Sequence, residues 1–478
     1  MDEKIITGKI LKQRGWPEGK IIGLAKNVGG RLMAEGIDRE TVLSRLDAVL
    51  AAPRDFFEDA VLVDVAHELV RRQAVEVSKI ESALRPAPLD FPIWGRDGID
   101  EGAITQMRNS MSLPITAAGA LMPDAHVGYG LPIGGVLATT DAVIPYAVGV
   151  DIACRMRLSV YDVSPHVLGQ RKGQLEKALL TQTHFGMGSA WPKNQRPEHE
   201  VLDDEAWKST KFLRGLQFKA MEQIGSSGTG NHFVEWGELE LTEPASDMGL
   251  KAGKYLALLS HSGSRAVGAK IASEYSKIAM NLHPTLENHV RHLAWLPLES
   301  EPGLEYWISM ELAGRFASAN HAIIHKMVAK AAGLEEVAKV ENHHNFAWKE
   351  TLEDGSEVIV HRKGATPAGK GVLGVIPGSM GDPGYVVRGK GVGPSINSAS
   401  HGAGRKMGRK QAINSLTKLM RDRYLQERGV TLLGGGLDEA PQAYKDIESV
   451  LAAQSDLVEV VAKFTPRIVK MANEPGDV

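Results

Sequence analysis

The sequence of 478 residues contains a single cysteine, Cys154. One cysteine excludes an internal disulfide, so the stability of the fold cannot depend on an oxidising compartment. The thiol is therefore free for chemistry or for packing in the core.

Long apolar runs are also missing. No stretch approaches the roughly 18 consecutive apolar residues of a membrane span, and the first residues, MDEKIITGKILKQRG, lack the apolar core and cleavage pattern of a signal peptide. We therefore expect a cytoplasmic protein without a membrane partner. The net charge is only −3, which argues against uniform binding to nucleic acid. Any nucleic-acid partner must meet a local basic patch.

Standard nucleotide-binding motifs and internal repeats are absent as well. No segment matches GxxxxGK[ST], and no GxGxxG follows a predicted strand. These absences exclude a standard nucleotide triphosphatase and a dinucleotide-binding domain. Without a repeat of fixed period or a clear linker, one large catalytic domain is favoured over a string of modules.

The apolar residues, 43% of the chain, indicate a globular protein with a substantial core. Helical spacing behind capping residues predicts a helical segment at 1–94. From there on, short apolar runs separated by glycine and proline predict strands and tight turns. We also expect helices near 301–332 and 410–427, and a helical C-terminal tail ending in Val-Lys-Met-Ala. The predicted fold is α+β, with a catalytic domain at 95–478 behind the helical addition.

A carboxylate and the only thiol lie close together, because Asp151 and Cys154 are three residues apart. This spacing lets both side chains reach one metal ion from a turn or a strand end, although a buried cysteine without a ligand role fits it equally well. Three histidines in turns rich in glycine or asparagine strengthen the metal hypothesis: His232, His261 and His344. Five candidate ligands exceed the needs of one four-coordinate ion, so a two-metal site is predicted.

The identity of the metal is open at this point. A thiolate that bridges two ions would account for the single cysteine, and the softness of a thiolate favours zinc over manganese. Other histidines lie in helix-like or polar surroundings, where we expect a structural or solvated role: His166, His199, His283, His289 and His292.

Glycine-rich loops offer backbone N–H groups to an anion. They occupy residues 225–233, 376–385, 388–393 and 400–409. In the last loop, His401 precedes the cations Arg405 and Lys406. A histidine in this setting could attack a phosphoryl group and carry it as a phosphoramidate. The same motif also fits a plain helix-start turn with His401 as a cap or a surface residue.

Nine motifs occur together in the order MPDAHVGYGLPIGGV, GVDIACRMRL, GTGNHFVEW, SHSGSR, HHNFAW, RKGAT, IPGSMG, SHGAGR and LDEAPQAYKDI. With these motifs, residues 95–472 resemble the RtcB family of RNA ligases. The resemblance implies one α+β catalytic domain that uses two manganese ions and GTP. Such an enzyme guanylylates a histidine and then joins an RNA 3′-phosphate or 2′,3′-cyclic phosphate end to a 5′-hydroxyl end. Manganese thereby replaces zinc as the expected metal.

The resemblance also implies a role for each candidate ligand. Asp151, Cys154 and His232 would bind one manganese ion. Cys154, His261 and His344 would bind the other.

The resemblance further assigns His401 as the guanylylated nucleophile. Tyr444 and Lys470 resemble the family's C-terminal contacts on the guanine side. The full set of expected guanylate contacts is Asn231, His232, Phe233, Val234, Glu235, His344, Asn345, Pro377, Gly378, Ser379, Met380, His401, Gly402, Ala403, Gly404, Tyr444 and Lys470.

Two positions depart from the family pattern. Arg155 stands where the family usually has a glycine, which predicts a change in substrate or nucleotide preference. Gly384 stands where many members carry a serine that touches the nucleotide, so one hydrogen bond is expected to be missing. Arg265, Arg405 and Lys406 are candidates for holding RNA or nucleotide phosphates.

Other functions remain open on the sequence. One alternative is a two-metal phosphodiesterase or phosphatase that acts on RNA ends without a nucleotide adduct. Another is a non-catalytic RNA-binding subunit, which the presence of all five ligands and His401 disfavours. The expected partners are RNA and an archease activator, and we expect a monomer. Repair of a particular cleaved RNA is as compatible with the sequence as tRNA splicing.

Overall fold

The computed structural model describes residues 6–473, without the side chains of 74–81. The chain divides into two units, Met1–Ala83 with His283–Leu286, and Leu84–Leu282 with Glu287–Val478. The boundary expected after residue 94 stays a prediction. Within the described part of the chain, no helix is both long and apolar enough to cross a membrane.

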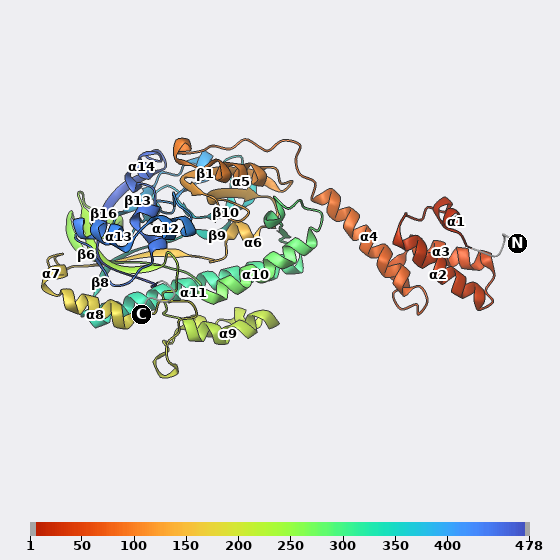
Figure 1. Ribbon diagram of the computed structural model, residues 1–478, viewed down its shortest axis with the longest axis horizontal. Helices are drawn as coiled ribbons and strands as arrows, with labels where there is room; N and C mark the ends of the chain where they lie inside the picture. Colours follow the sequence, from red (N-terminus) through yellow and green to blue (C-terminus); the bar gives the residue numbers. More distant parts are fainter. Residues whose placement is uncertain (1–5, 474–478) are drawn as a thin grey trace. The chain divides into compact units, whose positions relative to one another are not determined.

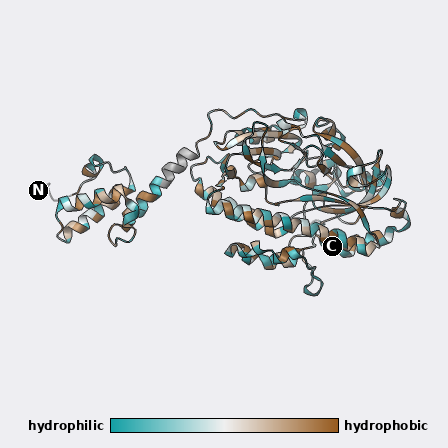
Figure 2. Cartoon of the chain, turned by 180° about the vertical axis from the view of Figure 1, so that it is seen from behind, coloured by the Kyte–Doolittle hydropathy of each residue, from teal (hydrophilic) through white to brown (hydrophobic). Residues whose placement is uncertain are grey.

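The first unit is helical, in agreement with the spacing of its apolar residues. Thr7 and Asp38 cap two of its helices by accepting hydrogen bonds from backbone N–H groups. The helices mix hydrophobic and hydrophilic residues along their length (Figure 2), and the apolar residues form one core. The elements are α1 (Gly8–Gln13), α2 (Lys20–Ala34), α3 (Arg39–Ala51), η1 (Pro53–Phe56) and α4 (Val63–Glu81).

The second unit mixes helices and sheets, so the α+β prediction is confirmed. Its α-helices are α5 (Glu101–Met111), α6 (Pro145–Val148), α7 (Val167–Gln170), α8 (Lys172–Gln182), α9 (Lys211–Gln223), α10 (Arg265–Leu282), α11 (Glu301–Ala332), α12 (Arg409–Ser415), α13 (Lys418–Glu427) and α14 (Ile447–Ala452). Its 3-10 turns are η2 (Arg96–Gly98), η3 (Lys193–Gln195), η4 (Glu200–Asp203), η5 (Glu205–Lys208), η6 (Ser246–Met248), η7 (Arg291–Leu293), η8 (Gly393–Ser395), η9 (Leu437–Glu439) and η10 (Pro441–Ala443).

The strands of this unit pair into four sheets within the described residues. They are β1 (Thr116–His126), β2 (Ile133–Thr139), β3 (Ala142–Val143), β4 (Arg155–Tyr161), β5 (Phe233–Leu241), β6 (Gly253–Ser262), β7 (Leu296–Pro297), β8 (Glu336–His343), β9 (Asn345–Thr351), β10 (Glu357–Lys363), β11 (Ala365–Pro367), β12 (Leu373–Ile376), β13 (Gly384–Gly389), β14 (Ser398–Ser400), β15 (Thr431–Leu432) and β16 (Val458–Met471). The sheets have the orders β1-β2-β10-β9, β11-β14, β3-β7 and β12-β13-β16-β5-β6-β4-β8, with β15 added to β16.

The largest sheet nearly closes on itself. Asn342 of β8, the last strand in its order, donates from its side-chain amide to the carbonyl of Val375 in β12, the first strand, and accepts from the N–H of Val375. Helices α8 and α11 cover one face of this sheet (Figure 1), where Ile324 and Val328 pack against Trp236. The opposite face carries the candidate site.

The long helix expected at 301–332 is confirmed as α11. Ser300 caps its start by accepting from the Gly303 N–H, and Gly333 ends it with a φ of 65°. The helix expected at 410–427 is two helices, α12 and α13, because Thr417 leaves the helical conformation and caps α13.

The helical prediction for the C-terminal tail is wrong. Residues 458–471 form β16, which lies between β13 and β5 in the large sheet. Many residues of this segment are β-branched, and pairing with a strand on each side supplies backbone hydrogen bonds in place of those of a helix. In this stretch of the chain, only α14 is helical, and it ends at Ala452.

Candidate metal centre and nucleotide pocket

The five candidate ligands come together because they lie at one end of four adjacent strands. Asp151 and Cys154 form the turn before β4, and His232 directly precedes β5. His261 lies at the end of β6, and His344 directly follows β8. Strands β5, β6, β4 and β8 are neighbours with alternating directions. Two strand starts and two strand ends therefore meet at the same edge of the sheet.

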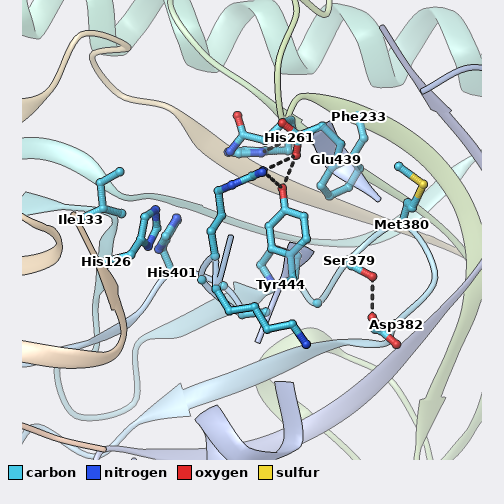
Figure 3. Close-up of a pocket in the computed structure, with 18 of the residues that line it drawn as sticks. His126, Ile133, Phe233, His261, Ser379, Met380, Asp382, His401, Glu439 and Tyr444 are labelled. Carbon is cyan, nitrogen blue, oxygen red and sulfur yellow. Dashed lines mark hydrogen bonds and ion pairs between the residues drawn. The ribbon is translucent and has the colours of Figure 1, made fainter. Parts of the chain in front are cut away.

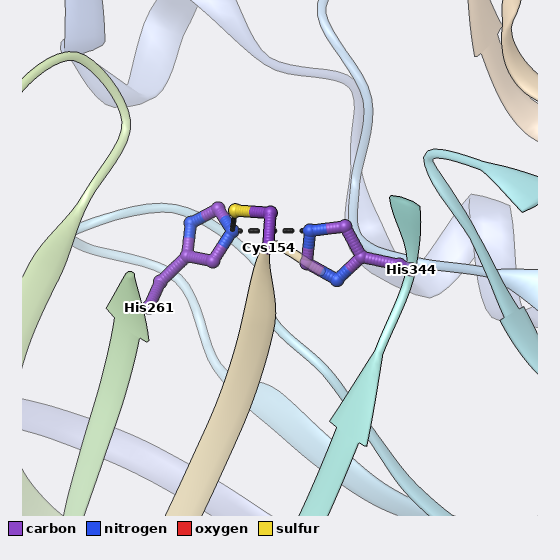
Figure 4. A group of neighbouring side chains, drawn as sticks. All are labelled: Cys154, His261 and His344. Carbon is purple, nitrogen blue, oxygen red and sulfur yellow. Dashed lines mark hydrogen bonds between the residues drawn. The ribbon is translucent and has the colours of Figure 1, made fainter. Parts of the chain in front are cut away.

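The ligand atoms form two groups that share the thiol. The Cys154 Sγ lies 3.0 Å from His261 Nε2, which lies 3.2 Å from His344 Nε2 (Figure 4). On the other side, Sγ lies 3.5 Å from His232 Nε2, which is 2.9 Å from Asp151 Oδ2. Within each group the ligand atoms lie within 4.8 Å of one another. The geometry agrees with two metal positions bridged by the thiol.

Two of the rings are fixed in the tautomer that a metal requires. The Nδ1 of His232 donates to the Ser227 carbonyl at 2.9 Å, and the Nδ1 of His261 donates to the Asn231 carbonyl at 3.0 Å. Because each proton is on Nδ1, each Nε2 presents a lone pair to the shared thiol.

Burial sets the ionisation of this group. It raises the pKa of the Cys154 thiol well above its usual value, with a contribution from the Asp151 charge. It lowers the pKa of His261 and His344 well below their usual range. Neutral imidazoles and a thiol that converge in a buried space leave several lone pairs facing one another, which a divalent cation satisfies. The donor set therefore fits metal ions.

A carboxylate that the sequence interpretation missed holds the candidate nucleophile. The Nδ1 of His401 donates to Asp124 Oδ2 at 2.7 Å, and the same oxygen accepts from the backbone N–H groups of His401 and Gly402. Asp124 is fully buried in β1. The MPD motif contains this residue, but only the fold shows that its carboxylate faces residue 401.

The loop approaches Asp124 closely enough to require a glycine. At Gly404, φ is +73° and an added Cβ would lie 2.1 Å from the Asp124 carbonyl oxygen. The ring of His401 lies 4.8 Å from that of His344, centroid to centroid. The candidate nucleophile is thus placed directly beside the candidate metal centre.

A cavity of about 760 Å³ extends from this centre. Figure 3 shows His401, His261 and Tyr444 among the residues of its wall. The dashed line at the lower right marks the hydrogen bond between Ser379 and Asp382. Of the expected guanylate contacts, those lining the cavity are Asn231, Phe233, Glu235, His344, Pro377, Gly378, Ser379, Met380, His401, Gly402, Ala403, Gly404 and Tyr444. The volume is sufficient for a nucleotide.

Comparison with known proteins assigns the family. Residues 106–471 match the family described as tRNA-splicing ligase RtcB. The RNA-splicing ligase RtcB of Escherichia coli K12 is 33% identical over 389 residues, covering 76% of this chain and 92% of that protein. The chain belongs to the RtcB family of RNA ligases.

Bacterial and archaeal relatives agree with this assignment. The RNA-splicing ligase RtcB of Mycobacterium tuberculosis is 32% identical, covering 76% of this chain and 98% of that protein. The tRNA-splicing ligase RtcB of Thermococcus kodakarensis is 29% identical, covering 82% and 96%. The RtcB resemblance and the prediction of a ligase enzyme are confirmed.

Four of the expected guanylate contacts do not line the cavity: His232, Val234, Asn345 and Lys470. Val234 pairs with Lys470, and both side chains lie on the opposite face of the sheet from their neighbours Phe233 and Met471. Met471 lines the cavity in place of Lys470. Asn345 instead supports the turn that carries the candidate ligands Asp151 and Cys154, because its side chain donates to the Asp151 carbonyl at 3.3 Å.

One part of the cavity is mostly apolar. Phe233, Leu259, Met380 and Met471 line it together with the carboxyl group of Glu235. Glu235 is 4% exposed, and no hydrogen bond from another described residue reaches its side chain. Burial raises the pKa of this carboxyl well above its usual value. A buried carboxyl group that lacks a protein partner indicates a ligand with N–H donors.

Arg155, which follows Cys154 and departs from the RtcB pattern, points away from the cavity. Arg155 pairs with Glu341, which also accepts from Ser318 of α11. The next residue, Met156, lines the cavity. The alternation of β4 thus directs Arg155 toward α11, and its side chain does not line the cavity.

The other departure and two of the phosphate-binding candidates do line the cavity. Gly384 lies beside Pro377, whose Cα would be 3.3 Å from an added Cβ. Arg405 stacks over the ring of Tyr444 and pairs with Glu439, and Lys406 follows it along the wall. Arg265 does not line the cavity. It has a φ of 57° and donates to Ser226 beside the His232 turn.

Proposed function

We propose that this chain is a GTP- and manganese-dependent RNA ligase that joins 3′-phosphate or 2′,3′-cyclic phosphate ends to 5′-hydroxyl ends through a histidine–GMP intermediate. The observation that carries the proposal is the pair His401–Asp124. The Nδ1–H of His401 donates to the buried carboxylate of Asp124. The Nε2 lone pair of His401 is therefore available inside a nucleotide-sized cavity. Two groups of candidate metal ligands that share Cys154 lie next to it and support the proposal.

The donor groups define where two manganese ions would bind. Asp151, Cys154 and His232 would hold one ion, and Cys154, His261 and His344 would hold the other. When bound, the ions neutralise charge on phosphate oxygens and favour the ionised form of nearby nucleophiles.

The protein groups then support three displacement steps. His401 Nε2 attacks the α-phosphate of GTP, so a P–N bond forms and pyrophosphate leaves. A 2′,3′-cyclic phosphate end first takes up water, which breaks the bond from phosphorus to the 2′-oxygen and leaves a 3′-phosphate and a 2′-hydroxyl. An oxygen of the RNA 3′-phosphate next displaces the histidine and takes the GMP. Finally, the RNA 5′-hydroxyl attacks the activated 3′-phosphate, a phosphodiester forms and GMP leaves. Throughout, Asp124 keeps the imidazole oriented and stabilises positive charge on it.

The remaining wall of the cavity is suited to the nucleotide. We place the base against Phe233 and Met471, with its N–H donors toward Glu235. Backbone N–H groups at 378–380 are available to the phosphates, because those of His401 and Gly402 donate to Asp124 and that of Ala403 donates to the Pro377 carbonyl. Arg405 is held by Glu439 and Tyr444, so Lys406 is the more available cation for an RNA phosphate.

Incubation with α-labelled GTP and manganese, followed by a denaturing gel, tests the proposal. We expect a labelled protein band that disappears in His401→Ala and persists in His166→Ala, which removes an exposed histidine outside this cavity. Persistence of the band in His401→Ala would overturn the assignment of the nucleophile. An unlabelled wild-type protein that hydrolyses RNA phosphate ends would instead identify a two-metal phosphodiesterase. Parallel ligation reactions with and without archease test that activator.

A further inference from the structure

An exposed aromatic ring stands at the opening of the cavity. Tyr129 is 69% exposed and still lines the cavity that holds His401. It belongs to the loop between β1 and β2, together with Val127, which is 53% exposed and also lines the cavity. Exposure of large apolar groups costs solvation free energy, so a fixed exposed ring beside a site indicates a binding surface.

The loop that carries this ring is held by several hydrogen bonds. The Gln106 side chain donates to the Gly128 carbonyl at 2.6 Å and accepts from the Gly128 N–H at 2.9 Å. The buried Lys363 donates to the carbonyl of Tyr129 itself. At Gly130, φ is +70° and an added Cβ would lie 3.0 Å from the His292 carbonyl oxygen. The position of the Tyr129 backbone is therefore set by the fold.

Two further rings continue from Tyr129. Its ring centroid lies 6.0 Å from that of His292, which lies 4.9 Å from that of Tyr146. Both pairs meet edge to face at 75°. His292, for which the sequence predicted a structural or solvated role, is exposed, and its neighbour Arg291 adds an exposed cation. We call the residues Tyr129, His292 and Tyr146 the aromatic row.

We propose that the aromatic row binds the unpaired bases of the RNA end that enters the cavity, with Tyr129 stacking on the nucleotide nearest to His401. This inference rests on the proposed function. A base has an apolar face whatever its identity, so one aromatic ring can hold any terminal nucleotide without selecting a sequence. The exposed Arg291 supplies a cation for the phosphate of the same strand.

The position of the row favours a nucleic acid over a protein partner. Tyr129 lines the cavity itself, so whatever stacks on it is within reach of the reacting phosphate. Rings that meet edge to face present separate faces along the row, as successive bases of a single strand require.

Binding of a fluorescent single-stranded RNA with a 3′-phosphate tests the proposal through a double-mutant cycle. One axis is Tyr129→Ala in the full chain, and the other is an RNA whose terminal base is replaced by an abasic site. Without GTP no ligation occurs, so anisotropy reports affinity alone. Tyr129→Phe keeps the ring, and Phe218→Ala is the matched control because it removes a ring that is 63% exposed on α9.

We expect Tyr129→Ala to weaken binding of intact RNA by at least about fivefold, which is the lower range of one base–aromatic stack. The same variant should bind the abasic RNA as the wild type does, because the stacked base is already missing. Tyr129→Phe and Phe218→Ala should retain wild-type affinity. A general structural effect of Tyr129→Ala would weaken binding of both RNAs equally, and this result would overturn the proposal.

The remaining outcomes separate this inference from the proposed function. If the wild type is labelled by GTP and binds RNA, but the cycle shows no coupling, the aromatic row is not the stacking surface and the ligase proposal stands. If the wild type neither becomes labelled nor binds RNA, both proposals fall. If Tyr129→Ala changes only the stimulation by archease, the surface serves a protein partner and the RNA proposal is overturned.

Discussion

The two ends of the cavity hold their side chains in different ways. At the metal end, candidate ligands sit at the ends of four paired strands, and the rings of His232 and His261 are fixed by hydrogen bonds to backbone carbonyls. At the base end, apolar side chains surround one carboxyl group, Glu235, that accepts from no described residue. The first end assembles a set of candidate metal ligands, among which the buried His344 Nδ1 also lacks a hydrogen-bond partner, whereas the second presents a single buried carboxyl group that needs a ligand.

This difference explains which assignments transfer from the family residue by residue. The ligand positions come from turns next to strands, where motif and backbone are fixed together. The base end depends on which face of β16 a residue occupies, and the pleat places Met471 rather than Lys470 in the cavity. Variants that act on one end only will test the comparison.

The largest effect is expected from Cys154→Ser. Because Sγ belongs to both ligand groups, its removal should abolish tight binding of both manganese ions. Elemental analysis of the dialysed protein measures the ions per chain, and His166→Ala serves as the control. Retention of one full equivalent of manganese would show that the thiol does not bridge.

The next largest effect is expected from Asp124→Asn. The neutral amide cannot stabilise the positive charge that develops on His401, so the rate of GTP labelling should fall on the order of 100-fold. Manganese content should stay at the wild-type value, because Asp124 is outside both ligand groups. A labelling rate within twofold of the wild type would show that Asp124 only shapes the loop. Single-turnover labelling over a range of pH provides the measurement.

A large part of this arrangement could be predicted from the sequence. Helix α11 and the N-terminal helices follow from apolar spacing, and the two-metal hypothesis follows from five ligands around one cysteine. The strand β16 was not predictable from its periodicity, because pairing on both sides determines its conformation. Asp124 was missed for a related reason. Its motif shows a carboxylate, but the contact with His401 spans 277 positions.

A smaller effect is expected from Arg155→Ala, which should lower stability without changing GTP labelling. Removing this side chain in Arg155→Ala leaves Glu341 buried with fewer partners, so the free energy of unfolding should fall by about 3 kcal/mol. GTP labelling at low temperature should be unchanged in extent, since the side chain faces α11. Denaturant unfolding measures the loss. Arg315→Ala, which breaks a more exposed pair with Asp204, should cost less than about 1 kcal/mol. Equal losses in the two variants would contradict the burial argument.

The smallest effect is expected at the base end, where Glu235 should make the free energy of unfolding depend on pH. Because the pKa of Glu235 is raised in the folded state, that state binds a proton that the unfolded chain has lost, and stability falls as pH rises toward the folded pKa. Glu235→Gln has no such proton, so it should become more stable relative to wild type by at most about 1.4 kcal/mol for each pH unit. Denaturant unfolding of the nucleotide-free protein from pH 5 to 8 measures this slope. A difference that does not change with pH would mean that Glu235 has a partner in solution, and the base end would then no longer need its ligand to satisfy this carboxyl group.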